Sequence, residues 1–277
     1  MSRYGFVIDI TKCNGCYNCF LACKDEHCEN EFPGYSAPQP MTGQYWLNMA
    51  EVERGQFPKV KVAYIAVPCM HCDDAPCIEA ATNGAVYRRE DGIVVIDPVK
   101  AKGQKQIVSS CPYRVIYWNE ALEIPQKCTM CAHLLDAGFK EPRCSEVCPT
   151  GALKFGDLDD PDSEVAKLVA SRKTEKMHTE FGLQEKVSYI GLPKRFVAGS
   201  VVFGDTKECA EGIDVVLKNA DESKMAKSDN FGDFEFEDLP ENIKYVVTIE
   251  ASGYKPVNIP VTTINDRYLG DIILDRQ

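Results

Sequence analysis

The sequence contains no long hydrophobic run and no recognisable leader segment. No stretch approaches the ~20 consecutive apolar residues that a membrane-spanning helix requires. Residues 1–9 lead directly into a cysteine motif, without the apolar core or the small-residue cleavage site of a secretory signal. We therefore expect a chain without a membrane span that is located in the cytoplasm, although a partner subunit with its own leader would change the location.

Basic residues are also in deficit. Lys and Arg number 31 against 42 Asp and Glu, which gives a formal net charge of −11. Since phosphate backbones are bound by basic surfaces, this balance argues against a nucleic-acid partner. The sequence also lacks a Walker loop, a dinucleotide-binding fingerprint and a nucleophile elbow. We expect no substrate site and no catalytic residue on this chain, and therefore a non-catalytic subunit.

Cysteine is the residue type that the sequence has in excess. There are 14 cysteines, and all but Cys209 precede residue 150. In a reducing compartment so many thiols favour metal sites over disulfides. The segment Cys13–Cys23 has the spacing C-x2-C-x2-C-x3-C, in which three thiols bind one [4Fe–4S] cluster and the fourth binds a second cluster. The motif therefore predicts another group of cysteines elsewhere in the chain.

An internal repeat supplies this group. Lys12-Cys13-x2-Cys16 matches Lys127-Cys128-x2-Cys131, and Cys19-x3-Cys23 matches Cys144-x3-Cys148. If the two halves exchange their last cysteine, as in two-cluster ferredoxins, the ligands of the first cluster are Cys13, Cys16, Cys19 and Cys148. The ligands of the second cluster are then Cys23, Cys128, Cys131 and Cys144.

Four further cysteines predict a third cluster, with the ligands Cys69, Cys72, Cys77 and Cys111. The ligands of a fourth cluster are absent, because the corresponding positions hold Ala81, Ala101, Gln104 and Ile107. Twelve cysteines therefore account for three [4Fe–4S] clusters in which every iron has a cysteine ligand. Since cluster catalysis typically needs an iron without such a ligand, the arrangement favours electron transfer or a structural role.

Zinc is the main alternative to iron at these cysteines. Structural zinc also uses C-x2-C pairs, but it does not need the run of four cysteines at residues 13–23. Cysteines followed by proline, as at Cys111 and Cys148, also suit iron–sulfur sites. Cys28 and Cys209 fall outside the three groups, and we expect them to be ordinary thiols.

Four residues beside the cysteines have two interpretations each. His71 and His133 either donate hydrogen bonds to cluster sulfurs or to carbonyl groups, or simply pack. Lys12 and Lys127, which precede the first cysteine of each repeat, either offset the negative charge of the clusters or are solvated.

Hydrophobic patterns predict mixed secondary structure in the cysteine-rich part. We expect strands at 4–10, 60–67 and 114–118, a hairpin at 84–97, helices at 98–110 and after Asp160-Pro161-Asp162, and a loop-like insertion at 24–68. From residue 197 onward, β-branched runs alternate with turns at a spacing of roughly 8–12 residues, as in β-sandwiches.

The charge distribution supports a division of the chain. Residues 1–196 carry 26 acids and 23 bases, net −3, whereas residues 197–277 carry 16 acids and 8 bases, net −8. We predict an α+β, ferredoxin-like cluster domain of two tandem units at 1–160 and an all-β sandwich at 197–277. Residues 161–196 are expected to form a helical or extended linker.

Several segments carry a resemblance to a known family. They are Cys69-Met70-His71-Cys72, Gly84-Ala85-Val86-Tyr87, Arg89-Glu90-Asp91-Gly92-Ile93-Val94, Cys111-Pro112-Tyr113 and Gln126–Leu135. In these segments and in the order of its cysteine groups, the chain resembles the iron–sulfur subunits of the dimethyl-sulfoxide-reductase family of molybdenum enzymes, which normally hold four clusters. The absent cluster, the segment Glu53-Arg54-Gly55 and the β-rich C-terminal part are similar to the small subunits of transhydroxylases of the pyrogallol–phloroglucinol type.

The resemblance implies a partner, a fold and a function. The implied partner is a large catalytic subunit that holds a molybdenum bis-pterin cofactor and forms a heterodimer, or an oligomer of heterodimers, with this chain. The C-terminal part is implied to be an immunoglobulin-like or carboxypeptidase-regulatory-like sandwich, whose pattern Gly232–Phe236 and Ala251–Tyr254 match. The implied function is that of a three-cluster subunit of an anaerobic, molybdopterin-dependent phenolic transhydroxylase.

Two other functions stay open. One is electron transfer for another molybdenum oxidoreductase, such as an aromatic hydroxylase, a dehydroxylase or a reductase. The other is a scaffold module with redox-silent clusters. Transhydroxylation moves a hydroxyl group between rings without net redox change, so an electron-transfer chain has no obvious role in it.

Overall fold

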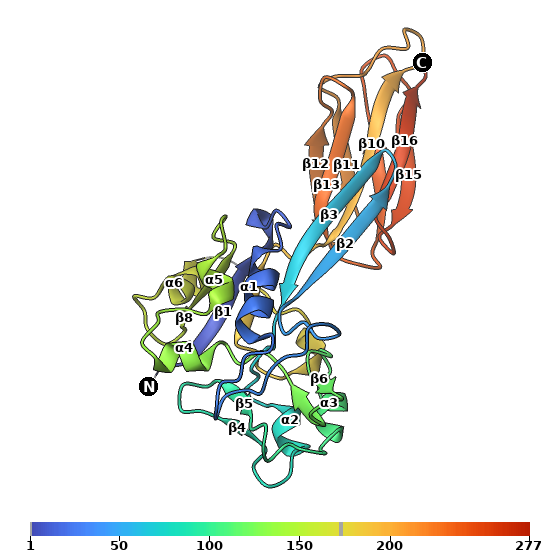
Figure 1. Ribbon diagram of the computed structural model, residues 1–277. Helices are drawn as coiled ribbons and strands as arrows, with labels where there is room; N and C mark the ends of the chain where they lie inside the picture. The colour runs from blue at the N-terminus through green and yellow to red at the C-terminus, as the bar shows by residue number, and fades with distance from the viewer. Residues whose placement is uncertain (1, 172–173) are drawn as a thin grey trace. The chain divides into compact units, whose positions relative to one another are not determined.

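The computed structural model describes residues 2–171 and 174–277. It divides the chain into two compact units (Figure 1). Unit 1 comprises residues 1–51 and 63–192, and unit 2 comprises residues 52–62 and 193–277. The division runs through a β-hairpin, whose strands β2 (Asn48–Gln56) and β3 (Lys59–Val67) contribute residues to both units. Within the described residues, no helix is long and apolar enough to cross a membrane.

A three-stranded sheet in unit 1 brings together the first and last cysteine motifs. β1 (Tyr4–Asp9) pairs antiparallel with β8 (Leu153–Asp157) and parallel with β9 (Val187–Ile190). The short 3-10 helix η1 (Ile10–Lys12) leads from β1 into Cys13, and β8 begins shortly after Cys148. The pairing of β1 with β8 therefore fixes two segments that are distant in the sequence next to each other.

The segment 161–196, expected to be a linker, contributes elements to unit 1. It contains α6 (Glu164–Ser171), η2 (Thr179–Phe181) and β9. Val165 of α6 packs with Val7 and Ile190 of the sheet, and all three side chains are buried. Since every residue of β9 is buried, this strand belongs to the core of unit 1.

Short elements hold the cysteine loops of unit 1. The longest helix among them, α1 (Asn18–His27), begins inside the first cysteine motif. The other helices have only one turn, and the strands form two small hairpins. These elements are α2 (Pro76–Glu79), α3 (Gln106–Ser109), α4 (Ala132–Asp136), α5 (Arg143–Glu146), β4 (Val86–Arg88) paired with β5 (Val94–Ile96), and β6 (Tyr117–Asn119) paired with β7 (Ile124–Gln126).

The hairpin predicted at 84–97 is confirmed, but three other predictions are wrong in extent. The strand expected at 114–118 is β6, which covers only Tyr117–Asn119. The helix expected at 98–110 is only α3, because the Asp97 carboxylate accepts the N–H groups of Val99 and Lys100 and organises turns instead. The expected loop at 24–68 contains the long hairpin of β2 and β3. Its Gly55 and Pro58 indicate a loop, but Gly55 lies near the end of β2 and Pro58 lies in the hairpin turn.

Unit 2 consists of two antiparallel or mixed sheets around one apolar core. One sheet has the order β13-β10-β16 and the other β12-β11-β14-β15. Buried residues of both sheets, such as Val201, Leu217 and Val247, belong to the same core cluster, which confirms the predicted β-rich C-terminal part. The strands are β10 (Arg195–Phe203), β11 (Asp214–Lys218), β12 (Ser223–Lys227), β13 (Asp233–Leu239), β14 (Lys244–Ile249), β15 (Val257–Thr262) and β16 (Arg267–Leu274).

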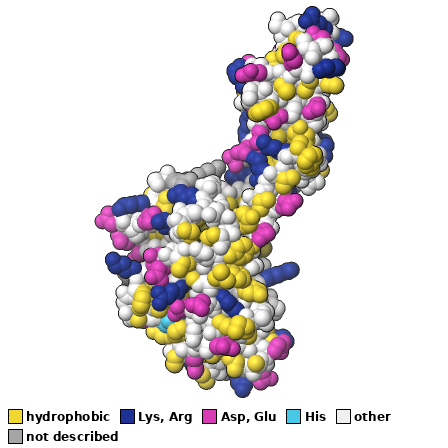
Figure 2. All heavy atoms as spheres, turned by 45° about the horizontal axis from the view of Figure 1, so that its top comes forward, with side chains coloured by type: hydrophobic (Ala, Val, Ile, Leu, Met, Phe, Trp, Pro, Cys, Tyr) yellow, Lys and Arg dark blue, Asp and Glu magenta, His cyan; other side chains and the backbone are white. Residues whose placement is uncertain are grey.

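The surface carries charges of both signs. On the face that Figure 2 shows, acidic and basic side chains are interspersed with hydrophobic ones. This mixture agrees with the moderate acidic excess of the composition. A single broad basic area of the kind that binds nucleic acid is not seen among the described residues on this face.

Candidate cofactor site

Three Cys-x-x-Cys segments form turns with a left-handed residue before the second cysteine. The backbone angle φ is 69° at Gly15, 45° at His71 and 51° at Met130. Residues other than glycine adopt this conformation rarely, and only where the surroundings require it. Its recurrence at the same position indicates that the three segments share one turn geometry.

Two Cys-Pro segments form a second kind of repeated turn. The N–H of Arg114 donates to the carbonyl of Cys111 at 3.1 Å, and the N–H of Gly151 donates to the carbonyl of Cys148 at 3.2 Å. The third residue after each cysteine is left-handed, with φ 56° at Arg114 and 63° at Gly151. Cys111 therefore occupies a turn like that of Cys148.

The structure brings the first predicted group of cysteines around one cavity, here named the Cys13 cavity. This cavity is lined by Cys13, Cys16, Cys19 and Cys148 together with mainly apolar side chains. The pKa of Cys19 is raised to about 11, mainly by burial and to a smaller extent by the nearby thiols of Cys148, Cys13 and Cys16. Such a thiol is protonated and inert unless a cation lowers its pKa.

A second cavity, here named the Cys69 cavity, is lined by the third predicted group. Its thiols are Cys69, Cys72, Cys77 and Cys111. Burial raises the pKa of Cys72 to about 12 and that of Cys77 to about 11, with further contributions from the other thiols of the group. The rest of its lining is mainly apolar and includes Val94, Val115 and Ile116.

The remaining group comprises Cys23, Cys128, Cys131 and Cys144, all of which are buried. Burial raises the pKa of Cys23, and the neighbouring thiols of Cys128 and Cys131 raise it further. The pKa of Cys144 is raised by burial and then by Cys131, Cys23 and Cys128. All four thiols are thus buried within unit 1.

Backbone amides point toward the cysteine sulfurs. The N–H of His71 donates to Cys69 Sγ at 3.5 Å, that of Met130 donates to Cys128 Sγ at 3.4 Å, and that of Leu153 donates to Cys148 Sγ at 3.4 Å. Amide hydrogen bonds of this kind stabilise negative charge on sulfur. Each of the three groups has at least one cysteine that receives such a bond.

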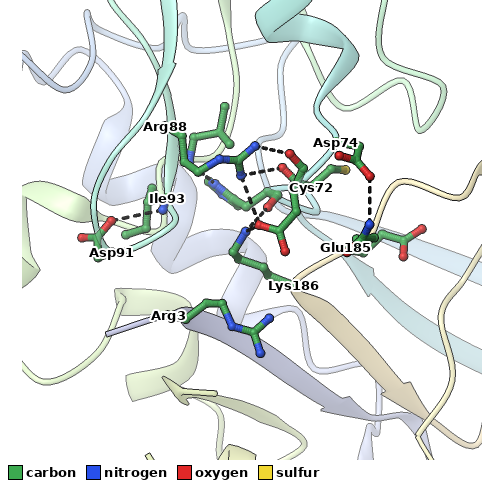
Figure 3. A network of polar contacts seen from close by, with 12 residues as sticks. Arg3, Cys72, Asp74, Arg88, Asp91, Ile93, Glu185 and Lys186 are labelled. Atoms are coloured by element: carbon green, nitrogen blue, oxygen red, sulfur yellow. Dashed lines mark hydrogen bonds and ion pairs between the residues drawn. The ribbon is translucent and has the colours of Figure 1, made fainter. Parts of the chain in front are cut away.

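Cationic side chains hold the backbone around the Cys69 cavity. Arg88 Nη1 donates to the carbonyl of Cys72 at 2.8 Å, and Lys186 Nζ donates to the carbonyl of His71 at 3.1 Å (Figure 3). Lys127 Nζ donates to the carbonyls of Val94 and Cys128. Lys127 and Lys186 are 2% and 1% exposed, so solvent screens little of their charge.

The Cys69 cavity also contains a polar atom without a partner. The buried side chain of His71 lines the cavity, and its Nδ1 accepts the N–H of Val94 at 3.0 Å. Its Nε2 has no hydrogen-bond partner among the described residues. Buried donors are normally satisfied. Four thiols, inward amides and this unpaired nitrogen fit an anionic group with sulfur acceptors, such as an iron–sulfur cluster.

The other predicted residues have varied environments. Lys12 is half exposed and pairs with Asp9 at 3.8 Å, unlike the buried Lys127. His133 Nε2 lies 2.9 Å from Glu26 Oε1 rather than near a sulfur. All fourteen cysteines are free thiols, and Cys28 and Cys209 line neither cavity.

Three polar residues at these sites could not be recognised from sequence patterns. His27 is buried, and its Nε2 lies 3.7 Å from Cys131 Sγ. Arg88 and Lys186 reach the backbone of the Cys69 cavity from strand β4 and from the residue before β9. None of the three residues belongs to a sequence motif, so only the folded structure shows that they lie close to the cysteine segments.

A site for a single metal ion would need three or more ligands directed at one point. In residues 2–171 and 174–277, no three His, Cys, Asp or Glu side chains are arranged in this way. Eight of the thiols instead line the two cavities described above.

Comparison with known proteins identifies related sequences. The family described as "4Fe-4S dicluster domain" matches residues 60–158. The small subunit of pyrogallol hydroxytransferase from Pelobacter acidigallici is 46% identical over 261 residues, which covers 91% of this chain and 92% of that protein.

Two reductase subunits are also similar. An iron–sulfur subunit assigned to a dimethyl sulfoxide reductase of Halobacterium salinarum is 34% identical over 69% of this chain and 79% of that protein. The iron–sulfur subunit of an arsenate respiratory reductase from Shewanella sp. is 32% identical over 68% of this chain and 96% of that protein. The predicted ferredoxin-like [4Fe–4S] domain and the predicted family are thereby confirmed.

Proposed function

Because this chain belongs to the iron–sulfur electron-transfer subunits of the dimethyl-sulfoxide-reductase family of molybdenum enzymes, we propose that it carries three [4Fe–4S] clusters and serves a molybdopterin subunit that acts on phenolic compounds. The proposed ligands are Cys13, Cys16, Cys19 and Cys148 for the first cluster, Cys23, Cys128, Cys131 and Cys144 for the second, and Cys69, Cys72, Cys77 and Cys111 for the third.

One observation carries the proposal. Each of the two cysteine-lined cavities is bounded by four thiols that the sequence assigns to the same cluster. The thiols come from segments that are distant in the sequence, so their grouping is not a consequence of local spacing. The Cys69 cavity further supports three clusters, because its four thiols lie outside the internal repeat.

The chain contributes ligands and surroundings to the proposed clusters. A [4Fe–4S] cluster supplies reversible one-electron transfer. The cysteines hold the irons, the apolar lining excludes water, and the amides of His71, Met130 and Leu153 stabilise negative charge on sulfur. With every iron bound by cysteine, the clusters offer no open position to a substrate.

The phenolic substrate rests on sequence similarity. The high identity to a protein named pyrogallol hydroxytransferase small subunit supports a transhydroxylase partner. The similarity to reductase subunits favours a second candidate, in which the chain transfers electrons for another molybdenum oxidoreductase. We propose that the catalytic subunit holds the molybdenum bis-pterin, forms a heterodimer with this chain and determines the substrate.

Electron paramagnetic resonance of the co-purified complex distinguishes electron transfer by this chain from the scaffold role with redox-silent clusters. Under anaerobic conditions the complex is titrated with a phenolic substrate and, separately, with a soluble one-electron donor. Cluster signals that change with either reagent support electron transfer in this chain. Clusters that stay silent, while cysteine variants nevertheless prevent assembly with the large subunit, support a scaffold and contradict the electron-transfer role.

Three further features belong to the same proposal. Unit 2 is proposed to be an immunoglobulin-like or carboxypeptidase-regulatory-like sandwich, and its two sheets around one core support this. Unit 1 is proposed to be the cluster domain, now extended through residue 192. Cytoplasmic location stays a prediction, which fractionation of the native cells would test.

A further inference from the structure

His71 differs from the other residues that line the Cys69 cavity because only one of its two ring nitrogens has a hydrogen-bond partner among the described residues. Its side chain is 1% exposed and lines the cavity beside Cys69 and Cys72. The backbone angle φ of 45° and the bond from the His71 N–H to Cys69 Sγ fix this residue within the turn. The imidazole is therefore anchored at the wall of the cavity.

The contact to Val94 determines where the imidazole carries its proton. The N–H of Val94 donates to His71 Nδ1 at 3.0 Å, so Nδ1 has no proton of its own. A neutral imidazole then carries its proton on Nε2, which makes this atom a donor. This donor is buried and has no acceptor among residues 2–171 and 174–277. A hydrogen-bond acceptor within the cavity would give the Nε2 proton of His71 its missing partner.

The electrostatic surroundings suit a group that gains negative charge. Lys186, Arg88 and Lys127 all donate to carbonyls of the segments that carry His71 and Val94. Asp73 pairs with both Lys186 and Arg88 and offsets part of their charge. The wall that contains His71 is thus positively biased, and a donor on this wall favours the more reduced state of a cluster.

We propose that His71 Nε2–H donates a hydrogen bond to a sulfur of the cluster held by Cys69, Cys72, Cys77 and Cys111, and thereby raises the reduction potential of this cluster. The inference rests on the proposed function, since it requires that the third cluster is present. His71 is a positioning residue in this account: it binds no iron and acts on the one-electron equilibrium of the cluster through its proton.

Two substitutions separate the Nε2 proton from the other roles of His71. His71→Asn tolerates the left-handed backbone, and its short amide can still accept the Val94 N–H, but no donor reaches the former Nε2 position. His71→Gln is longer and places an amide N–H near that position. A merely structural role predicts similar effects of both variants, whereas the proposed bond predicts a loss only in His71→Asn.

The experiment is a redox titration of the whole complex with dithionite and mediators, which supply single electrons, monitored by electron paramagnetic resonance. The signal that disappears in Cys111→Ser identifies the third cluster. In His71→Asn, reduction of this cluster should become about tenfold less favourable, which is about 59 mV for a one-electron couple. In His71→Gln the potential should return toward that of the wild type. Unchanged potentials in His71→Asn, or equal shifts in both variants, would overturn the inference.

Two further measurements keep the outcome unambiguous. Pulsed electron paramagnetic resonance of the reduced wild-type complex, labelled with ¹⁵N-histidine, should show a nitrogen coupling in the third-cluster signal. The absence of this coupling overturns the inference even if the variants fail to assemble.

Iron analysis of the wild type shows whether the proposed function fails instead. About 8 irons per chain means that the third cluster is missing, whereas about 12 irons with unchanged potentials refutes the role of His71 alone.

Discussion

Lysine precedes the first cysteine in both halves of the internal repeat, but the two side chains have different surroundings. Lys127 is 2% exposed and donates to the carbonyls of Val94 and Cys128. The side chain of Lys12 is 51% exposed, and its Nζ lies 3.8 Å from an Asp9 oxygen. A charge acts strongly where solvent is excluded and weakly where solvent screens it. The repeat therefore provides a pair of lysines at equivalent positions, one buried against carbonyl groups and one exposed beside a carboxylate.

Lys127→Met should lower the reduction potential of the adjacent clusters, because the buried cation favours their more negative, reduced state. We expect reduction to become about tenfold less favourable, about 59 mV for a one-electron couple. Lys12→Met is the control and should shift its neighbouring cluster much less. Both are measured by redox titration of the complex, and equal shifts in the two variants would contradict a role for burial.

Residue types at the sites were predictable where chemistry requires a fixed spacing. The sequence predicts eight cysteines as ligands from the motif and the repeat, and Cys69, Cys72, Cys77 and Cys111 as the set that remains for one further cluster. It left Lys127 and His71 with two interpretations each, since burial decides between them and depends on tertiary packing. Arg88 and Lys186 were missed, because they reach the Cys69 cavity from other elements.

At the scale of elements, helix α6 packs on the three-stranded sheet of unit 1. Val165 is fully buried against Val7 and Ile190, whereas Val169 on the same helix is 42% exposed. The sequence predicts an amphipathic helix with Val165, Leu168 and Val169 on one apolar face, and the exposure of Val169 corrects the last of these three. It did not predict that the helix and β9 complete unit 1, because a parallel partner of β1 that comes late in the chain has no local signature.

Val165→Ala should destabilise unit 1, because it removes two buried methyl groups worth roughly 1–3 kcal/mol together with the cavity that they leave. The metal-loaded chain is unfolded by heat under anaerobic conditions, and the lowest-melting transition should move down. Val169→Ala removes the same atoms from an exposed position and should change the stability by less than about 0.5 kcal/mol. A larger effect of Val169→Ala would mean that α6 packs through its other face.

The long hairpin shows why turn residues misled the prediction. Gly55, near the end of β2, and Pro58, in the turn before β3, interrupt the hydrophobic pattern, so the sequence indicates a loop there. Gly55 has φ 86°, and a Cβ at this position would lie 2.3 Å from the carbonyl oxygen of Lys59. The hairpin therefore requires glycine at this position. Glycine is common both in hairpins and in open loops, so its presence in the sequence does not show which of the two forms, and only the pairing of the two strands distinguishes them.

At the scale of the whole molecule, buried thiols make the metal-free chain sensitive to high pH. Burial raises the pKa of Cys19 and Cys128 to about 11 and that of Cys72 and Cys131 to about 12. Unfolded thiols titrate near ~8.5. Because the folded pKa is the higher one, the stabilisation is fully present below pH ~8.5 and is lost as pH rises through the folded values.

The metal-free, fully reduced chain should therefore unfold at progressively lower urea concentrations as pH rises from about 9 to about 12. The midpoint is followed by fluorescence at each pH in the presence of a reductant. A Cys72→Ala/Cys131→Ala double variant has fewer buried thiols, so its midpoint should fall less steeply over the same range. A wild-type midpoint that does not change between these pH values would contradict the burial of the thiols.

Division of the chain into a cysteine-rich part and a β-rich part was predictable from composition, but its boundaries were not. The shift in charge and strand pattern begins near residue 197, close to residue 193, where the larger segment of unit 2 begins. The hairpin residues 52–62 also belong to unit 2, although they lie far earlier in the sequence. Contacts between segments that are distant in the sequence determine which unit a residue belongs to, and these contacts cannot be inferred from composition.

Anaerobic iron and acid-labile sulfide analysis of the purified complex tests the central claim of three clusters most directly. Twelve cysteine ligands in three groups predict about 12 irons and about 12 sulfides for each copy of this chain, after the metal content of the isolated large subunit is subtracted. Cys77→Ser should reduce both numbers by about 4, whereas Cys209→Ser should leave them unchanged. About 8 or about 16 irons, or a stoichiometric amount of zinc, would contradict the account.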